Sequence, residues 1–150
     1  MNFISAFSFS KQAVTVTTQA SKLLYKLVAI DTKYILCAGS YILEIYRIPD
    51  HKMLEVCKVE TSIYDICLVQ RAGDAVDYAL GTWEGVWFVR VHVGEEPYRV
   101  EVLPLKVRQR ESINNVVRFR ENLLLYADGS QLILFDRTQL SDQCSLWLPS

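Results

Sequence analysis

Few residues of this sequence have the type and spacing that metal binding or catalysis requires. Its two histidines are His51, in an expected turn, and His92, at the end of an expected strand. Neither has a second histidine, a cysteine or a carboxylate at the spacing of metal ligands. The carboxylate pair Glu95-Glu96 precedes a proline and is expected to be solvated in a turn. The motifs of serine hydrolases, P-loop proteins, dinucleotide-binding proteins and zinc proteases are missing. We therefore predict no catalytic residue, no metal site, no cofactor and no enzymatic activity.

The four cysteines suggest packing rather than chemistry. Each lies in or beside an apolar run, without a CxxC pair or a repeated spacing; they are Cys37, Cys57, Cys67 and Cys144. We expect buried or half-buried thiols in a reducing compartment, which favours the cytoplasm.

The opening stretch "MNFISAFSFSKQ" lacks basic residues before its apolar ones, so no signal peptide is expected. No segment has the apolar length that spans a bilayer, and no membrane association is predicted.

Length and charge describe an ordinary globular chain. The 150 residues are 51% hydrophobic and 22% charged, which suits one domain with a sizeable core. Sixteen basic and seventeen acidic residues give a net charge of −1. Because no strong positive field would attract a phosphate backbone, nucleic-acid binding is not expected.

Two local features suggest binding. In "KVRQRES" (106–112), Lys106, Arg108 and Arg110 alternate, so they can share one face of an extended segment and contact an anion or an acidic peptide. The alternative is a solvated loop. In "GTWEGVWF" (81–88), Trp83 lies in an expected tight turn between two glycines. It either contributes to a partner surface or folds back over its own unit.

The sequence repeats with a period of about 45 residues. The segments "YILCAGSYILEIYRI" (34–48), "YALGTWEGVWFVRV" (78–91) and "LLLYADGSQLILFDR" (123–137) align, with two sets of apolar positions at steps of 44 and 45. We expect these positions to be buried in corresponding places: Leu36, Leu80 and Leu125, and Ile45, Val89 and Leu134. Upstream of each segment are three apolar residues separated by two others: Leu24, Leu27 and Ile30; Ile63, Ile66 and Val69; Ile113, Val116 and Phe119.

Each repeat has the signals of four β-strands, because β-branched and aromatic residues are dense and turn residues separate them. The expected strands are about 23–30, 33–39, 41–48 and 53–59, then 62–69, 77–82, 86–93 and 97–103, then 112–119, 122–127, 131–136 and 143–148. Apolar runs in the second and third strands predict burial on both faces. The prediction is an all-β fold of three four-stranded antiparallel blades, at about 23–60, 61–104 and 112–148 within a domain 23–150.

These units resemble the blades of WD-repeat β-propellers, which have this period and four strands each. "LGTWEGVWFVR" is similar to the hairpin between the second and third strands of that family, with Glu84-Gly85 where Asp-Gly is usual. In "ADGSQLILFD", Asp128-Gly129 form the turn and Phe135-Asp136 stand at the Trp-Asp position. No unit has the Gly-His dipeptide, so the buried hydrogen-bond tetrad of the family is not expected.

The resemblance implies a partner-binding face. In such folds these hairpins lie on the same face as the segments that lead into the next blade. The residues that would meet there are Tyr41, Trp83, Glu84, Arg108, Arg110 and Ser130. Aromatic and arginine side chains dominate protein interfaces.

Three blades do not close a ring, since propellers have four to eight. The N-terminal segment 1–22 contains a strand-like "AVTVTT" (13–18) that could complete a last blade. The chain is then the first part of a longer propeller, half of a six-bladed ring of two copies, or a unit completed by another subunit; a non-propeller β fold is the remaining alternative. The predicted function is a non-catalytic protein-interaction scaffold, and the alternative is a ligand-binding or enzymatic propeller with a site in a central funnel.

Overall fold

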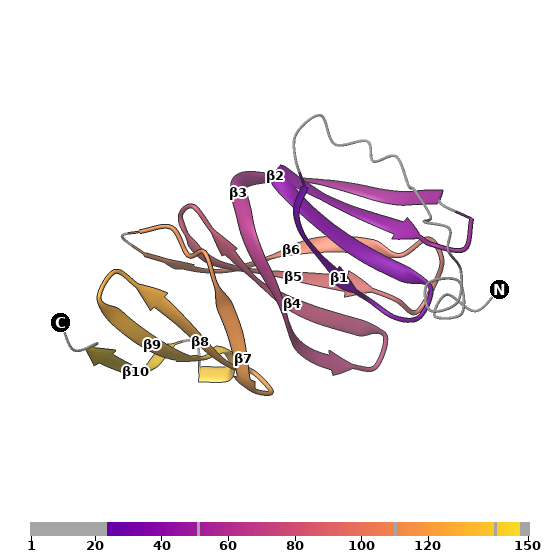
Figure 1. The fold of residues 1–150 in the computed structure, drawn as a ribbon. Helices are drawn as coiled ribbons and strands as arrows, with labels where there is room; N and C mark the ends of the chain where they lie inside the picture. Colours follow the sequence, from indigo (N-terminus) through magenta and orange to yellow (C-terminus); the bar gives the residue numbers. More distant parts are fainter. Residues whose placement is uncertain (1–23, 51, 110, 140, 148–150) are drawn as a thin grey trace, which may run out of the picture.

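The computed structural model describes residues 24–50, 52–109, 111–139 and 141–147. The expected N-terminal segment 1–22, with its strand-like stretch, lies outside these residues. The described chain is built from β-strands joined by short turns (Figure 1). The elements are β1 (Leu24–Ala29), β2 (Tyr34–Arg47), β3 (Lys52–Ala72), β4 (Ala75–Thr82), β5 (Gly85–His92), β6 (Arg99–Arg108), β7 (Val116–Arg120), β8 (Leu123–Asp128), β9 (Gln131–Asp136), the short 3-10 helix η1 (Arg137–Gln139) and β10 (Ser141–Trp147). Within this part of the chain, no helix has the length and apolarity to cross a membrane.

The element β2 consists of two strands that fold back on each other. The amide of Ile48, just after β2, donates to the carbonyl of Lys33, just before it, at 2.8 Å. The two ends of β2 therefore lie side by side. Tyr41, at the middle of β2, has a φ of 62° and marks the turn. The first arm pairs with β1 and the second arm pairs with β3, as the expected strands 33–39 and 41–48 require.

The long strand β3 belongs to two units. Its first part pairs with β2 from Lys52 to Ser62, and its second part pairs with β4 from Ile63 to Ala72. The expected break near residues 60–61 is therefore absent. The connecting residues "KVETS" (58–62) contain no glycine or proline, so nothing in them ends a strand.

Pairing divides the strands into three four-stranded antiparallel units. The first unit holds β1, the two arms of β2 and the first part of β3, and the second holds the rest of β3 with β4, β5 and β6. The third holds β7 to β10, in a sheet of its own. The predicted all-β, antiparallel, propeller-like fold is confirmed.

Two apolar cores lie between the units. The first unit faces the second through residues that include Leu36 and Ile45 on one side, and Leu80 and Val89 on the other. The second unit faces the third through Ala79, Val86 and Phe88 on one side, and Leu124, Tyr126, Ile133 and Phe135 on the other. The middle unit is thus covered on both faces, and almost every residue of β4 and β5 is buried.

The predicted alignment of the repeats is wrong by one residue in the second unit. Cross-strand pairs join Leu27 to Cys37, Ile66 to Leu80, and Val116 to Tyr126. Leu80 therefore corresponds to Cys37 and Tyr126, and not to their neighbours Leu36 and Leu125. Since successive residues of a strand point to opposite faces, Leu80 faces the first unit, whereas Leu36 faces the second. Val89 is displaced relative to Ile45 and Leu134 in the same way.

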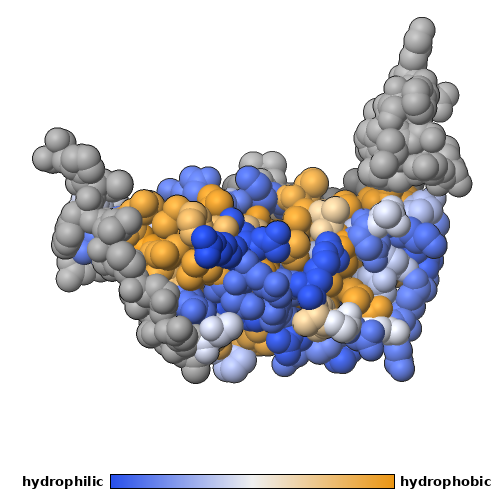
Figure 2. Space-filling view, turned by 90° about the horizontal axis from the view of Figure 1, so that it is seen from below, coloured by the Kyte–Doolittle hydropathy of each residue, from blue (hydrophilic) through white to orange (hydrophobic). Residues whose placement is uncertain are grey.

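Only one face of the third unit is covered. Half-buried and buried residues alternate over 123–126 in β8 and over 132–136 in β9. Leu125 and Leu134 were expected to be buried, but they are half-buried, because they lie on the face that has no neighbouring unit among the described residues. Burial on both faces was predicted for all three units; it holds for most residues of the inner strands in the first and second units and fails in the third. Figure 2 shows apolar residues gathered in the left half of the view, the end that holds β7 to β9.

Candidate functional site

The hairpin turns of the three units lie along one edge of the molecule, together with the segments that connect the units. Ser62, where the chain passes from the first unit to the second, pairs with Ser40 of the first hairpin. The carbonyl of the same Ser62 accepts a hydrogen bond from the amide of Trp83, at 3.1 Å. This contact places the first and second hairpins next to each other. We call the turns Ser40–Tyr41, Trp83–Glu84 and Gly129–Ser130, with the connecting residues 109 and 111–115, the hairpin rim.

The turn that carries Trp83 is held by its own backbone and by one buried hydroxyl. The hydroxyl of Thr82 donates to the carbonyl of Gly85 at 2.9 Å and accepts from the amide of Glu84 at 3.1 Å. Gly85 has a φ of 137°, which side chains rarely tolerate. With the bond from the Trp83 amide to Ser62, the backbone of the turn is fixed.

Two large aromatic side chains project from the first and second hairpins. The side chain of Trp83 is 65% exposed and that of Tyr41 is 50% exposed. The alternative in which Trp83 folds back over its own unit is therefore wrong. Trp87 is buried, as expected for the core residue of this segment. Glu84 lies half-buried beside Trp83 in the turn.

The segment that connects the second and third units runs along the same edge. The amide of Gln109 donates to the carbonyl of Glu84 at 3.1 Å, and the amide of Ile113 donates to the carbonyl of Thr82 at 2.8 Å. Gly81 allows this approach, because a Cβ atom there would lie 2.4 Å from the carbonyl oxygen of Ile113. The two glycines that flank the turn thus have different roles. Gly81 leaves room for the backbone of Ile113, and Gly85 adopts a φ that other residues rarely adopt.

The basic residues of this region are described only in part. Arg108 still belongs to β6, and its backbone pairs with Gly85, directly beside the Trp83 turn. The side chain of Arg108 and the whole of Arg110 lie outside the described residues. The Nζ of Lys106 lies 3.9 Å from the ring centre of Trp87. The expected common face of the three cations stays a prediction, because the other two side chains lie outside the described residues.

The third hairpin completes the rim. Gly129 has a φ of 59°, and Ser130 next to it is exposed. The carboxylate of Asp128 accepts a hydrogen bond from the amide of Glu111 at 3.3 Å. The structure thus brings the hairpins and a connecting segment to one edge, as the resemblance implied; no contact tests whether they bind a partner.

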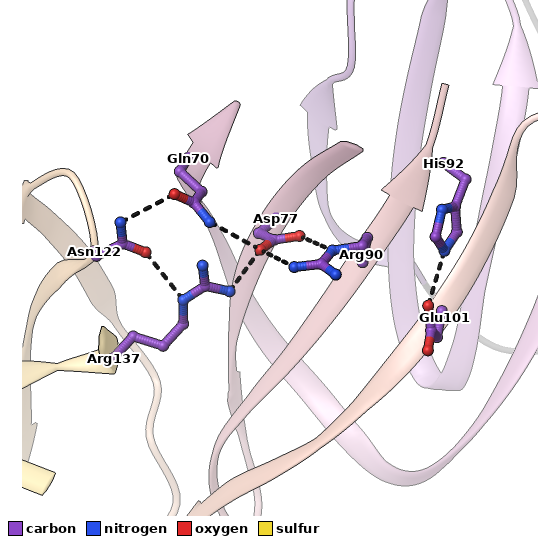
Figure 3. A network of polar contacts seen from close by, with 7 residues as sticks. All are labelled: Gln70, Asp77, Arg90, His92, Glu101, Asn122 and Arg137. Carbon is purple, nitrogen blue, oxygen red and sulfur yellow. Dashed lines mark hydrogen bonds and ion pairs between the residues drawn. The ribbon is translucent and has the colours of Figure 1, made fainter. Parts of the chain in front are cut away.

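A buried polar network lies toward the opposite end of the strands and was not predicted (Figure 3). The carboxylate of Asp77 on β4 accepts from Arg90 on β5 at 2.7 and 2.9 Å, and from Arg137 of the third unit at 2.6 Å. Arg137 also donates to the side chain of Asn122 at 3.0 Å, and Asn122 donates to Gln70 at 3.0 Å. The network therefore joins the second and third units.

The environment of Asp77 favours its charged form. Burial alone would raise the pKa of this carboxyl group, but hydrogen bonds from Arg90, Arg137 and Gln70 and the charge of Arg137 lower the pKa to about 2. The available signal was a single aspartate in an otherwise apolar strand, which requires a charged partner when buried. The partner Arg137 is 60 residues away, so the sequence could not identify it.

Metal ligands and thiols are the reactive groups that the sequence analysis considered. The described residues contain no group of three metal-ligating side chains. Burial raises the pKa of the Cys37 thiol to about 11 and that of the Cys67 thiol to about 12, so both are protonated and poor nucleophiles.

Asp65, on β3 of the second unit, has structural contacts with both other units. Its carboxylate lies 3.3 Å from the ammonium of Lys26 and accepts a hydrogen bond from the amide of Val116 at 2.9 Å.

The sequence matches no protein-family model and no curated protein. Among solved structures, the chain is similar to the β-propeller domain of Myceliophteria thermophila Cps50 (Swd1), with a TM-score of 0.54 and 16% identity over 79% of this chain. It spans 40% of that domain. A chain of a mitotic checkpoint complex matches with a TM-score of 0.44 and 10% identity, over 89% of this chain and 53% of that one. The likeness to Cps50 shows that the fold is that of a β-propeller segment.

Proposed function

We propose that this chain is a non-catalytic scaffold that binds a protein partner through the hairpin rim. The observation that carries the proposal is the position of Trp83: a large aromatic side chain, mostly exposed, on a backbone turn that hydrogen bonds hold in place. Tryptophan buries a large area when a partner covers it and loses few rotatable bonds. Because the turn is already ordered, binding does not incur the entropy cost of fixing a loop.

The chemistry of the rim favours a protein over other ligands. Tyr41 adds a second exposed aromatic ring on the neighbouring hairpin, while Arg108 and Arg110 are expected to add cations beside Trp83. A partner with an apolar patch and nearby acidic side chains fits this combination. In our proposal the partner is neither a nucleic acid nor a membrane, and the chain works in the cytoplasm within a larger assembly. The alternative, an enzyme or small-ligand binder with a central funnel, lacks support from any described residue.

The test compares two exposed apolar residues. Trp83→Ala should weaken partner binding by more than about 1 kcal/mol, roughly fivefold in Kd. Leu27→Ala, which removes an equally exposed side chain away from the rim, should leave the Kd unchanged. The measurement is the affinity between the full chain and the proteins that co-purify with it from its native cells. If both variants bind as the unmodified chain does, the rim is not the binding site.

A further inference from the structure

A groove lies between the first part of β3, in the first unit, and β6, in the second unit. We call it the inter-unit groove. Its lining includes residues 58–60 of β3, Val102, Pro104 and Lys106 of β6, and Trp87 of β5, and its volume is about 540 Å³. This volume lies in the range of ligand-binding clefts. None of these residues belongs to the hairpin rim, so the groove is a separate candidate site.

Irregular pairing in both walls shapes the groove. Between Lys58 and Ser62, β3 advances by four residues while its partner strand β2 advances by two. Between Val102 and Lys106, β6 advances by four residues while β5 advances by two. The extra residues form β-bulges, and Pro104 lies within the second one. Because bulges interrupt a ladder and redirect side chains, they are frequent beside binding and active sites.

The inter-unit groove contains two lysines without acidic partners. Lys58 is exposed and Lys106 is half-buried, and no carboxylate of the described residues lies within ion-pair distance of either ammonium group. With Glu60 as the third charged residue, the groove has a net charge of +1. A single carboxylate would balance this charge. A phosphate group, with about two negative charges, would exceed it and would be repelled by Glu60.

The indole of Trp87 provides a hydrogen-bond donor that is not used. Trp87 is only 3% exposed, and its Nε1–H has no acceptor among the described residues. Buried indoles usually donate to an acceptor, because a buried donor without a partner destabilises the structure. The ammonium group of Lys106 lies 3.9 Å from the centre of the same ring. A lysine without a carboxylate and an indole without an acceptor therefore adjoin each other, and an acidic, hydrogen-bonding ligand would satisfy both.

We propose that the inter-unit groove binds an extended segment of a partner protein through one acidic side chain. The carboxylate pairs with Lys58 and Lys106, and a neighbouring apolar side chain of the segment covers Val102 and Pro104. When the ammonium of Lys106 moves from the ring of Trp87 to the carboxylate, the indole Nε1–H becomes accessible to a backbone carbonyl of the segment. A small carboxylate would pair with the lysines but would leave the apolar wall uncovered, which favours a peptide. This inference does not depend on the function proposed for the hairpin rim.

The experiment is a nuclear magnetic resonance titration of the isotope-labelled full chain. It follows the indole Nε1–H signal of Trp87, which Trp87→Phe identifies. The probes are short acetylated and amidated peptides with a central glutamate between leucine, isoleucine, valine or phenylalanine residues, and the matched control peptides have a central glutamine. The glutamate peptides should shift the signal saturably, and the glutamine peptides should bind at least about tenfold more weakly, because they lack the charge. The absence of a shift, or equal binding of both sets, would overturn the proposal.

Two further probes distinguish the proposed occupant from other anions. Free acetate should not shift the Trp87 signal as the glutamate peptides do, and peptides with a central phosphoserine should bind more weakly than those with glutamate. An equal shift with acetate would indicate a site for small carboxylates. Tighter binding of the phosphoserine peptides would indicate a phosphopeptide site. Either result would contradict the proposal.

Lysine variants test the groove itself. Lys58→Gln and Lys106→Gln should each weaken the binding of glutamate peptides at least about fivefold, whereas Lys52→Gln, on the same strand as Lys58 and also exposed but outside the groove, should leave it unchanged. Because Lys58 is exposed, Lys58→Gln should keep the unfolding midpoint and gives a result even where Lys106→Gln alters the fold. Trp83→Ala, on the hairpin rim, should leave the titration unchanged. An unchanged affinity in Lys58→Gln would therefore contradict the groove proposal and not the rim proposal.

Discussion

Removing the carboxylate of Asp77 should destabilise the protein more than any other single change of a charged side chain among the described residues. Asp77 is buried and neutralises Arg137, whose side chain is only 11% exposed, as well as the more accessible Arg90. Breaking a buried ion pair leaves the remaining charge without a partner and typically costs 3–5 kcal/mol. Part of the guanidinium of Arg90 can turn to water, so we expect the lower end, about 3 kcal/mol, for Asp77→Ala. Asp77→Asn keeps an acceptor oxygen and should cost about 2 kcal/mol.

The same network predicts a pH dependence. Asp77 has a pKa of about 2 in the folded protein and an ordinary value of 3.8. A carboxyl group with a lowered pKa stabilises the folded state above its unfolded pKa and loses that stabilisation as the pH falls through the folded pKa. The contribution is about 2 kcal/mol at 1.36 kcal/mol per pKa unit. It should be complete above about pH 5 and lost progressively between about pH 4 and pH 2.

The assay is urea unfolding of the unmodified chain and Asp77→Asn from pH 2 to pH 7. The difference between the two free energies of unfolding should be largest near neutral pH and should shrink below about pH 4. Glu101→Gln is the matched control, since its carboxylate pairs with His92 at 2.8 Å and both side chains are substantially exposed; its cost should stay under about 1 kcal/mol. Equal costs for Asp77→Asn and Glu101→Gln, or a difference that does not vary with pH, would refute the reasoning.

Three further tests use five substitutions to examine packing. Leu80→Ala should lower the free energy of unfolding by about 2–5 kcal/mol because the side chain is fully buried between units. Leu125→Ala should lower it by less than about 2 kcal/mol. Equal shifts in the urea midpoint would contradict the one-sided burial of the third unit. Gly81→Ala should cost at least about 1–3 kcal/mol by overpacking against Ile113, and hydrogen exchange in β7 should rise with it. Trp87→Ala should cost about 3–5 kcal/mol, and thermal unfolding of Trp83→Ala should show a much smaller loss.

The fold could be predicted from the sequence because its determinants are local. Turn residues separate short β-branched and aromatic runs, and the period of about 45 residues groups those runs in fours. The hairpin from Thr82 to Gly85 needs only its own residues to form. The exposure of Trp83 follows from the same local geometry, since a tight turn leaves no room beneath its tip.

Contacts between residues that are far apart in the chain could not be predicted from the sequence. Asp77 and Arg137 meet only because the third unit packs on the second, and nothing in the spacing of two such residues encodes that contact. The long strand β3 is a second example. The sequence predicted its two parts as separate strands, but they form one continuous strand because the first unit and the second unit share this segment.

The misaligned repeat shows which signal determines register. Leu36, Leu80 and Leu125 have the same residue type at nearly equal steps, yet Leu80 points to the opposite face. In a unit that is buried on both faces, apolar residues occupy consecutive positions, so either alignment of the repeats places apolar residues on each face. A shared residue type therefore does not show which face of the sheet a side chain points to. The upstream residues Ile66 and Val116 gave the correct register, because each pairs with the equivalent residue, Leu80 or Tyr126. Leu125 is half-buried because it lies on the face of the third unit that no other described unit covers, whereas Leu80 lies between two units and is fully buried. The alternation of buried and half-buried residues in β8 and β9 is what a sheet shows when one of its faces is covered and the other is not.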